Sequence, residues 1–251
     1  MDKHFSDAFE RDGFAVLPQV LSAEQLGRLR ATVQDSVDPP LAPIEFEADV
    51  AYPGSPESQL AVGGQTPRRL LHAYGRDAVF RALARDPAIV SVLGQLLGGD
   101  GVFVSQNHHN CVMTKMPGFS SETQWHQDIR YWRFDRPELI SVWVALGDER
   151  VANGALRMIP GSHRTAFDPG RLDAKLFLRQ DLAENRALIE SAVDCELAAG
   201  DVVLFHCRTF HAAGRNTTDA PKLACVFTYH GADNHPIPGT RSSRFPSIRV
   251  D

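Results

Sequence analysis

The most informative stretch of this chain is TQWHQDIRYW at residues 123–132, which is read together with FHCRTFH at residues 205–211. His126 and Asp128 stand two positions apart, so on an extended strand their side chains would point to the same face. His211 follows much later, beyond predicted strands and turns. Two imidazoles and one carboxylate form the facial triad that holds Fe(II) and leaves the opposite coordination positions open. The pattern therefore predicts a metal site at His126, Asp128 and His211, of the kind found in oxygenases.

The context of these residues separates the metal site from a chance pattern. Most of the ten His residues of such a chain would be surface groups or satisfied core groups, and a single His-x-Asp pair is weak evidence. Here the pair follows the turn-rich loop MPGFSS at residues 116–121, and the run GDVVLF precedes the later His. Loop-flanked strand ends commonly present catalytic ligands. His206 and His230 remain the alternatives for the third ligand.

Composition excludes several classes of function. A net charge of −5 gives no general attraction to nucleic acid or to an anionic membrane. No apolar run approaches the ~20 residues of a membrane span, and the start of the chain has no apolar signal core. The four Cys lie far apart without a Cys-x-x-Cys pair, as expected for reduced thiols. We expect a cytoplasmic protein with a small-molecule substrate, and its oligomeric state is left open.

The first hundred residues are predicted to be mainly helical. Helices are expected over 5–12, 22–37, 77–85 and 87–97, and Ser22 with Gln25 forms a capping box. A short strand is expected at 13–17. Residues 39–66 are too rich in Pro and Gly for regular structure, so we predict a lid there.

From Val102 onward the pattern changes to short strands, expected at 102–105, 109–115, 127–133, 138–147, 154–159, 193–198, 201–206 and 222–230. Residues 168–191, with a helix near 181–189, are a second predicted lid. We find no repeat or linker, and we expect one domain over 1–251. Its predicted parts are a helical region of about 1–100, a barrel of about 101–232 and a tail at 233–251.

Several motifs in their order resemble the phytanoyl-CoA dioxygenase family of Fe(II)/2-oxoglutarate oxygenases, over most of the chain. They are DGF at 12–14, WHQD at 125–128, VWVAL at 142–146, NGALRMIPGSH at 153–163 and GD at 200–201. The resemblance implies a mainly β fold with flanking helices, namely a double-stranded β-helix (a jelly-roll or cupin-like barrel). It also implies Fe(II), 2-oxoglutarate as cosubstrate and O2, with release of succinate and CO2. Because Asp128 retains the carboxylate ligand, halogenation is not expected.

The resemblance also assigns residues to the cosubstrate. The family places an Arg eleven residues after the distal His, where this chain has Lys222, and Ala213 stands where a Ser is usual. A Lys supplies charge without the bidentate fork of an Arg. We expect Lys222 to anchor the distal carboxylate, with Arg215 as the alternative. Further positions matching cosubstrate contacts of the family are Arg68, Trp143 and Cys111. No catalytic residue beyond the metal ligands is expected.

The substrate is less well defined by the sequence. Arg130, Tyr131, Trp132 and Phe134 follow the metal motif and are expected to line the pocket mouth, as walls for a planar or anionic small molecule. The run TRSSR at 240–244 is either an anion-binding segment or a solvated tail. Hydroxylation is the expected outcome, with desaturation, epimerisation, epoxidation or cyclisation as alternatives. A cupin-type metal protein that does not use 2-oxoglutarate, or a binding barrel with a vestigial site, would be a different class.

Overall fold

The computed structural model describes residues 3–251. Its helices are α1 (Lys3–Asp12), α2 (Ala23–Val37), α3 (Ala73–Arg76), α4 (Ala78–Ala84), α5 (Pro87–Leu97) and α6 (Ala183–Glu190). Its strands are β1 (Phe14–Leu17), β2 (Ile44–Phe46), β3 (Pro67–Leu71), β4 (Val102–Val104), β5 (Asn110–Lys115), β6 (Thr123–His126), β7 (Leu139–Ala145), β8 (Leu156–Met158), β9 (Val193–Cys195), β10 (Val202–His206), β11 (His211–Ala213), β12 (Lys222–Gly231) and β13 (Ile248–Arg249).

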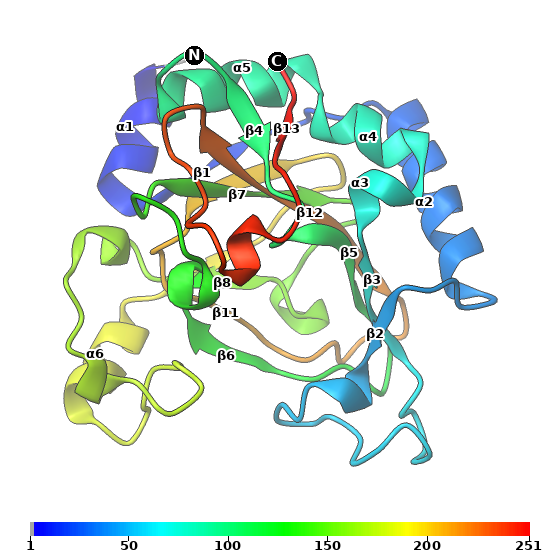
Figure 1. Cartoon of the computed structure of the whole chain (residues 1–251). Coiled ribbons are helices and arrows are strands. Elements are labelled where there is room, and N and C mark those ends of the chain that lie inside the picture. The colour runs from blue at the N-terminus through cyan, green and yellow to red at the C-terminus, as the bar shows by residue number, and fades with distance from the viewer. Residues whose placement is uncertain (1–2) are drawn as a thin grey trace.

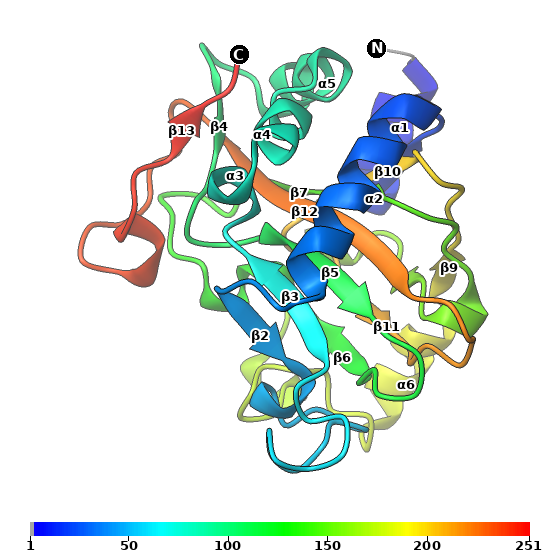
Figure 2. The ribbon, with the colours of Figure 1, turned by 90° about the vertical axis from the view of Figure 1, so that its right-hand side faces the viewer.

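The strands form two antiparallel sheets that face each other. The larger sheet has the order β1-β10-β7-β12-β5-β3-β2, with β4 paired to β12 and β13 paired to β4, and the smaller sheet has the order β6-β11-β8-β9. Figure 1 shows α1, α2, α4 and α5 on one side of the larger sheet and β6, β8 and β11 on the other. The same layering is seen from the side in Figure 2. This arrangement is the predicted double-stranded β-helix.

Strand β12 shows how alternate side chains enter the barrel interior and the helix-covered outer layer. Cys225, Phe227 and Tyr229 pack in the cluster that also contains the helix residues. Ala224 and Val226 belong instead to the cluster between the two sheets, and Lys222 lies on their face because side chains alternate along a strand. The alternation of this strand directs a Lys into the barrel.

Most predicted elements are confirmed, including the capping box at the start of α2, where Ser22 and Gln25 satisfy each other's backbone N–H groups. Two predictions are wrong. Residues 39–66 were expected to lack regular structure, but β2 lies within them and pairs with β3. Residues 127–133 were expected to form a strand, but Asp128–Tyr131 form the 3-10 helix η2. None of the helices among residues 3–251 has the length and apolar character of a membrane span.

Candidate metal centre and the two cavities beside it

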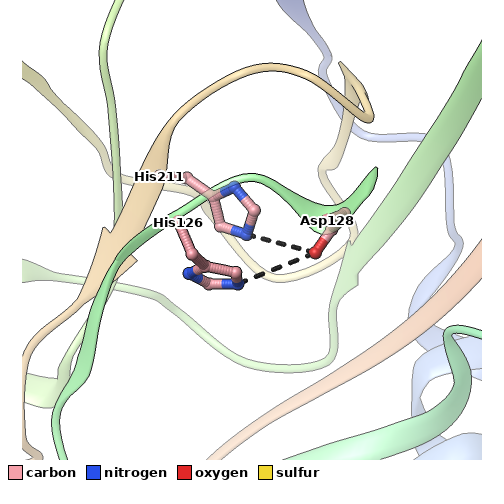
Figure 3. Close-up of side chains that lie close together, drawn as sticks. All are labelled: His126, Asp128 and His211. Carbon is pink, nitrogen blue, oxygen red and sulfur yellow. Dashed lines mark ion pairs between the residues drawn. The ribbon is translucent and has the colours of Figure 1, made fainter. Parts of the chain in front are cut away.

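The three predicted metal ligands meet at one point inside the barrel (Figure 3). His126 ends β6, His211 begins β11, and the two residues face each other in the antiparallel register of these strands. Asp128 Oδ1 lies 3.7 Å from His126 Nε2 and 3.6 Å from His211 Nε2. All three side chains are buried. The metal set expected from the sequence is thus assembled by two adjacent strands and the turn that follows one of them.

Asp128 reaches this point by a different route from the one predicted. Its backbone is not part of a strand, because β6 ends at His126 and Gln127 is the extended residue that precedes η2. The first turn of η2 brings the carboxylate back toward His126. Two polar groups then fix its orientation: His109 Nε2 lies 2.9 Å from Oδ1, and Ser141 Oγ donates to Oδ2 at 2.7 Å.

The hydrogen bonds of the two imidazoles select the tautomer that a metal requires. His126 Nδ1 donates to the carbonyl of Gln124 at 2.8 Å, and His211 Nδ1 donates to the carbonyl of Thr209 at 3.1 Å. A carbonyl accepts only a protonated nitrogen, so in each neutral ring Nε2 keeps its lone pair. Burial lowers the pKa of both imidazoles. Both rings therefore present an unprotonated Nε2 toward Asp128.

The carboxylate is held in its ionised form. Burial alone would raise the pKa of Asp128, but the neighbouring His109 and His211 outweigh it and keep this pKa well below its usual range. The donor set is accordingly two neutral imidazoles and one carboxylate, the set that suits Fe(II). Metal–ligand bonds of about 2.1 Å would place adjacent ligand atoms about 3 Å apart. The distances of 3.7 and 3.6 Å from Asp128 Oδ1 to the two Nε2 atoms therefore need to shorten only slightly when a metal binds. The residues fit a bound iron.

His109 was missed in the sequence analysis. It stands in the turn before β5, and burial, which would lower its pKa, is outweighed by Asp128, which raises this pKa to about 9. Groups that orient a metal-binding carboxylate in this way tune both its geometry and its affinity. No local pattern marks His109, because its contact with Asp128 depends on strands that pair only in the folded chain.

Two cavities meet at the metal centre. The lining of the inner cavity includes His126, His211, Trp143, Lys222 and Ala213. The outer cleft, of about 420 Å³, is lined by Asp128 and His126 together with the residues of the barrel mouth. Because His126, His109 and Arg69 line both, a metal at the triad would stand at the junction between them.

Lys222, the predicted cosubstrate anchor, lines the inner cavity and already has a partner. Its Nζ is 3.0 Å from Glu149 Oε2, and both residues are buried. The other oxygen of Glu149 accepts from Trp143 Nε1 at 2.8 Å, and the Lys ammonium also lies 4.9 Å from the centre of the Trp143 ring. The three residues form one charge-balanced unit. Glu149 was not singled out from the sequence, and the strand pairing brings it here.

A second buried Lys lies opposite the first. Lys115 on β5 faces Lys222 on β12 in the strand register. It also lines the inner cavity, and its Nζ donates to the carbonyl of Ser121 at 2.8 Å. Burial, with Lys222 and Arg68 as further causes, lowers the pKa of Lys115 to about 7. Glu149 and Glu47 also lie near these lysines, so an entering carboxylate would add a partner that favours the charged form of Lys115.

Of the three remaining predicted cosubstrate residues, one lines the inner cavity, one lines the outer cleft and one lies in an exposed loop. Arg68 lines the inner cavity, where its Nη1 donates to Glu45 Oε1 at 2.6 Å. Cys111 is buried and lines the outer cleft. Arg215 is exposed and donates to the carbonyls of Ser120 and Gly118. It is not among the lining residues of the inner cavity.

Three of the four predicted substrate residues line the outer cleft, and the fourth packs behind it. Arg130, Tyr131 and Trp132 line the outer cleft. Phe134 does not; it packs with Trp132 in the cluster behind the wall. Tyr52 and Phe177, one from each predicted lid, contact each other edge to face at 5.5 Å, and Phe177 also lies 5.9 Å from the His126 ring. The two lid segments thus meet beside the metal centre.

Comparisons with known proteins agree with this geometry. The phytanoyl-CoA dioxygenase (PhyH) family matches residues 9–224. Ectoine dioxygenase of Halomonas elongata is 30% identical and covers 96% of this chain and 73% of its own length. L-proline trans-4-hydroxylase of Streptomyces griseoviridis is 26% identical over 91% of this chain and 86% of its own length.

Solved structures share the fold. The structure of EctD from S. alaskensis with 2-oxoglutarate and 5-hydroxyectoine superposes with a TM-score of 0.79 at 22% identity, over 100% of this chain and 86% of that one. The alpha ketoglutarate dependent epimerase SnoN from nogalamycin biosynthesis gives a TM-score of 0.73 at 22% identity, over 94% of this chain and 84% of that one.

Proposed function

Because this chain belongs to the phytanoyl-CoA dioxygenase family, it is a non-heme Fe(II)/2-oxoglutarate-dependent dioxygenase, and we propose that it hydroxylates a small metabolite or biosynthetic intermediate in the outer cleft. The observation that carries this function is the buried triad of His126, Asp128 and His211, with both Nε2 atoms directed at the carboxylate. Two relatives are named as an ectoine dioxygenase and an L-proline trans-4-hydroxylase, which favours hydroxylation over the other oxidative outcomes.

The division into two cavities supports separate places for cosubstrate and substrate. Fe(II), when bound, would let O2 oxidise a substrate C–H bond while 2-oxoglutarate is decarboxylated to succinate. His126, Asp128 and His211 hold the metal, and the hydrogen bonds from His109 and Ser141 keep the carboxylate in place. The substrate would enter from the outer cleft, where Arg130, Tyr131 and Trp132 form part of the wall.

We assign the distal carboxylate of 2-oxoglutarate to the lysine end of the inner cavity. Lys222 is the proposed anchor, and Lys115, opposite it, is a second buried lysine whose Nζ donates to the carbonyl of Ser121. Trp143 supports Lys222 through Glu149, and Arg68 contributes to the same wall. Arg215 is the weaker candidate because it is exposed and bonded to loop carbonyls.

The partners are those of a small-molecule enzyme, and neither nucleic acid nor a membrane is proposed. A cytoplasmic location stays a prediction; the four cysteines are buried and unpaired, as thiols in a reducing compartment are.

Turnover tests the proposed reaction. Oxygen uptake and succinate formation should both require Fe(II) and 2-oxoglutarate, and they should rise when the correct small molecule is added from a candidate panel. Mass spectrometry of the product should show a gain of one oxygen atom. Asp128→Ala should remove both signals in a folded protein, because it removes one of only three ligands. Wild-type protein that forms no succinate under any condition would contradict the function, whereas a product two hydrogens lighter would change only the oxidative outcome.

A further inference from the structure

We propose that the outer cleft is an anion subsite, and that the substrate carries a carboxylate or a phosphate-type group held by Arg241 and Arg244. This substrate class presupposes the oxygenase function above and defines the substrate further. The two arginines belong to the 3-10 helix η6 (Arg241–Ser243) and the residue that caps it. Both line the cleft that also contains Asp128 and His126.

Segment 241–245 is a fixed wall of the cleft and not a solvated tail. Ser242 is buried between the two arginines, and its Oγ accepts from the backbone N–H of Arg133 and shares a hydrogen bond with His108 Nε2, both at 2.8 Å. Asn107 Nδ2 donates to the carbonyl of Ser242 at 2.8 Å. Figure 1 shows this short red helix in front of the barrel, and Figure 2 shows the red C-terminal segment beyond β4.

The charges that line the cleft are unbalanced. Its carboxylates are Glu45 and Asp128. Asp128 belongs to the metal set, and Glu45 contacts Arg68 at 2.6 Å and Arg69 at 3.4 Å. Within the part of the chain that the structure describes, no carboxylate forms an ion pair with the other three arginines of the cleft, which are Arg130, Arg241 and Arg244.

This local excess of positive charge contrasts with the whole chain, whose net charge is −5. Arg130 is held in place by the carbonyl of Lys175 and by the hydroxyl of Tyr52, and it stacks on Phe177 at 4.3 Å. Among residues 3–251, Arg241 and Arg244 have no side-chain hydrogen bond and both are exposed at the cleft; Arg244 lies 5.6 Å from the centre of the Phe245 ring. Guanidinium groups match the paired oxygens of carboxylates and phosphates. An arginine pair on a rigid turn, left without a protein acceptor, is suited to an anionic ligand.

The direction of the cleft then orients the substrate. Arg241 and Arg244 come to the cleft from the C-terminal segment, whereas His126 and Asp128 come from β6 and η2. Trp132 lines the cleft as an aromatic wall and is fixed by stacking on His108 at 4.8 Å. A ligand held by its anionic group at η6 would therefore present a remote, uncharged part to the metal. We expect oxidation at a carbon away from the anionic group.

The test measures binding of simple probes to the Fe(II) and 2-oxoglutarate-loaded protein without oxygen. The probes are 3-phenylpropionate, 2-phenylethyl phosphate and the neutral 3-phenylpropanamide, titrated by calorimetry at saturating 2-oxoglutarate. The visible Fe(II)/2-oxoglutarate absorption band is recorded in parallel to show that the cosubstrate stays bound. The variants are Arg241→Gln/Arg244→Gln and the charge-retaining Arg241→Lys/Arg244→Lys. Arg249→Gln is the matched control, because Arg249 is also an exposed arginine near the C-terminus but is not among the cleft residues.

At least one anionic probe should bind at least tenfold more tightly than the amide, and which probe does so identifies the group. The Gln double variant should lose at least tenfold of that affinity, the Lys double variant should lose less, and the amide and the control should be unaffected. No preference for either anion, or unchanged anion binding in the Gln double variant, would overturn the subsite. Absence of the absorption band in wild-type protein would instead refute the oxygenase function itself.

Discussion

At the scale of single residues, the site depends on groups that hold the metal ligands as much as on the ligands themselves. His126 and His211 were identifiable because a His-x-Asp pair and a distant His follow strand signals. The sequence did not identify His109, Lys115 or Glu149, because each of them acquires its role only when distant strands pair. The Glu149–Lys222 contact, for example, joins residues 73 positions apart in sequence. Local patterns contain no information on such contacts.

The role of His109 is testable by metal affinity. His109→Ala should weaken Fe(II) binding by roughly 10- to 100-fold, the usual effect of removing a group that supports a metal ligand. His109→Gln, which keeps a donor for Asp128, should recover part of the loss. Chelator competition followed by iron analysis measures both, with circular dichroism as the check on folding. Equal iron affinity in wild type and His109→Ala would refute a supporting role.

The cosubstrate anchor is testable through its charge. Lys222→Ala should weaken 2-oxoglutarate binding by roughly tenfold to a thousandfold, since about 1.5–4 kcal/mol of charge-assisted bonding is lost. Lys222→Arg should bind as well as the wild type or better. The Ala variant also leaves Glu149 buried without its partner, which destabilises proteins by about 3–5 kcal/mol, so its melting temperature must be measured too.

A second variant separates anchoring from stability. Glu149→Gln removes the competing carboxylate and frees Lys222, so 2-oxoglutarate should bind equally or more tightly by calorimetry. Weaker binding to Glu149→Gln would contradict Lys222 as the anchor. Impaired binding in Arg215→Ala together with normal binding in Lys222→Ala would move the anchor to Arg215.

At the scale of secondary structure, the sequence predicted elements with a strong local signal and failed where tertiary pairing decides. The capping box of α2 is such a local signal, and it is confirmed. Strand β2 is short and lies in a Pro-rich stretch, and it exists because β3 offers it a partner. The turn of η2 was taken for a strand because its aromatic residues suggested one, yet that turn carries Asp128 into the metal site.

The two lid segments, residues 39–66 and 168–191, should become better protected when the cavities are filled. Tyr52 and Phe177 already link them beside His126, and closing them would exclude water from the reaction. Hydrogen exchange with and without Fe(II) and 2-oxoglutarate measures this, with the buried strand β12 as the reference whose protection should stay constant. Equal protection of both segments in the two states would show that they are not lids.

At the scale of the whole molecule, the barrel places one metal centre between a lysine-bearing inner cavity and an arginine-bearing cleft. The double-stranded β-helix was predictable because family motifs run along most of the chain. The chemistry of the substrate was not predictable from the sequence, because the cleft combines residues from β3, the turn before β5, η2 and the C-terminal segment. The anion-binding alternative for residues 240–244 acquired support only from the contacts that fix Ser242.

We propose that His126, Asp128 and His211 form an Fe(II) centre that binds 2-oxoglutarate, and an anaerobic titration measures this binding. Fe(II) and then 2-oxoglutarate are added to the protein while the visible spectrum is recorded. A metal-to-ligand charge-transfer band should appear and saturate at one equivalent of each, and His211→Ala should abolish it without unfolding the protein. If the wild type showed no band, or if His211→Ala kept an undiminished band, these three residues would not form such an Fe(II) centre.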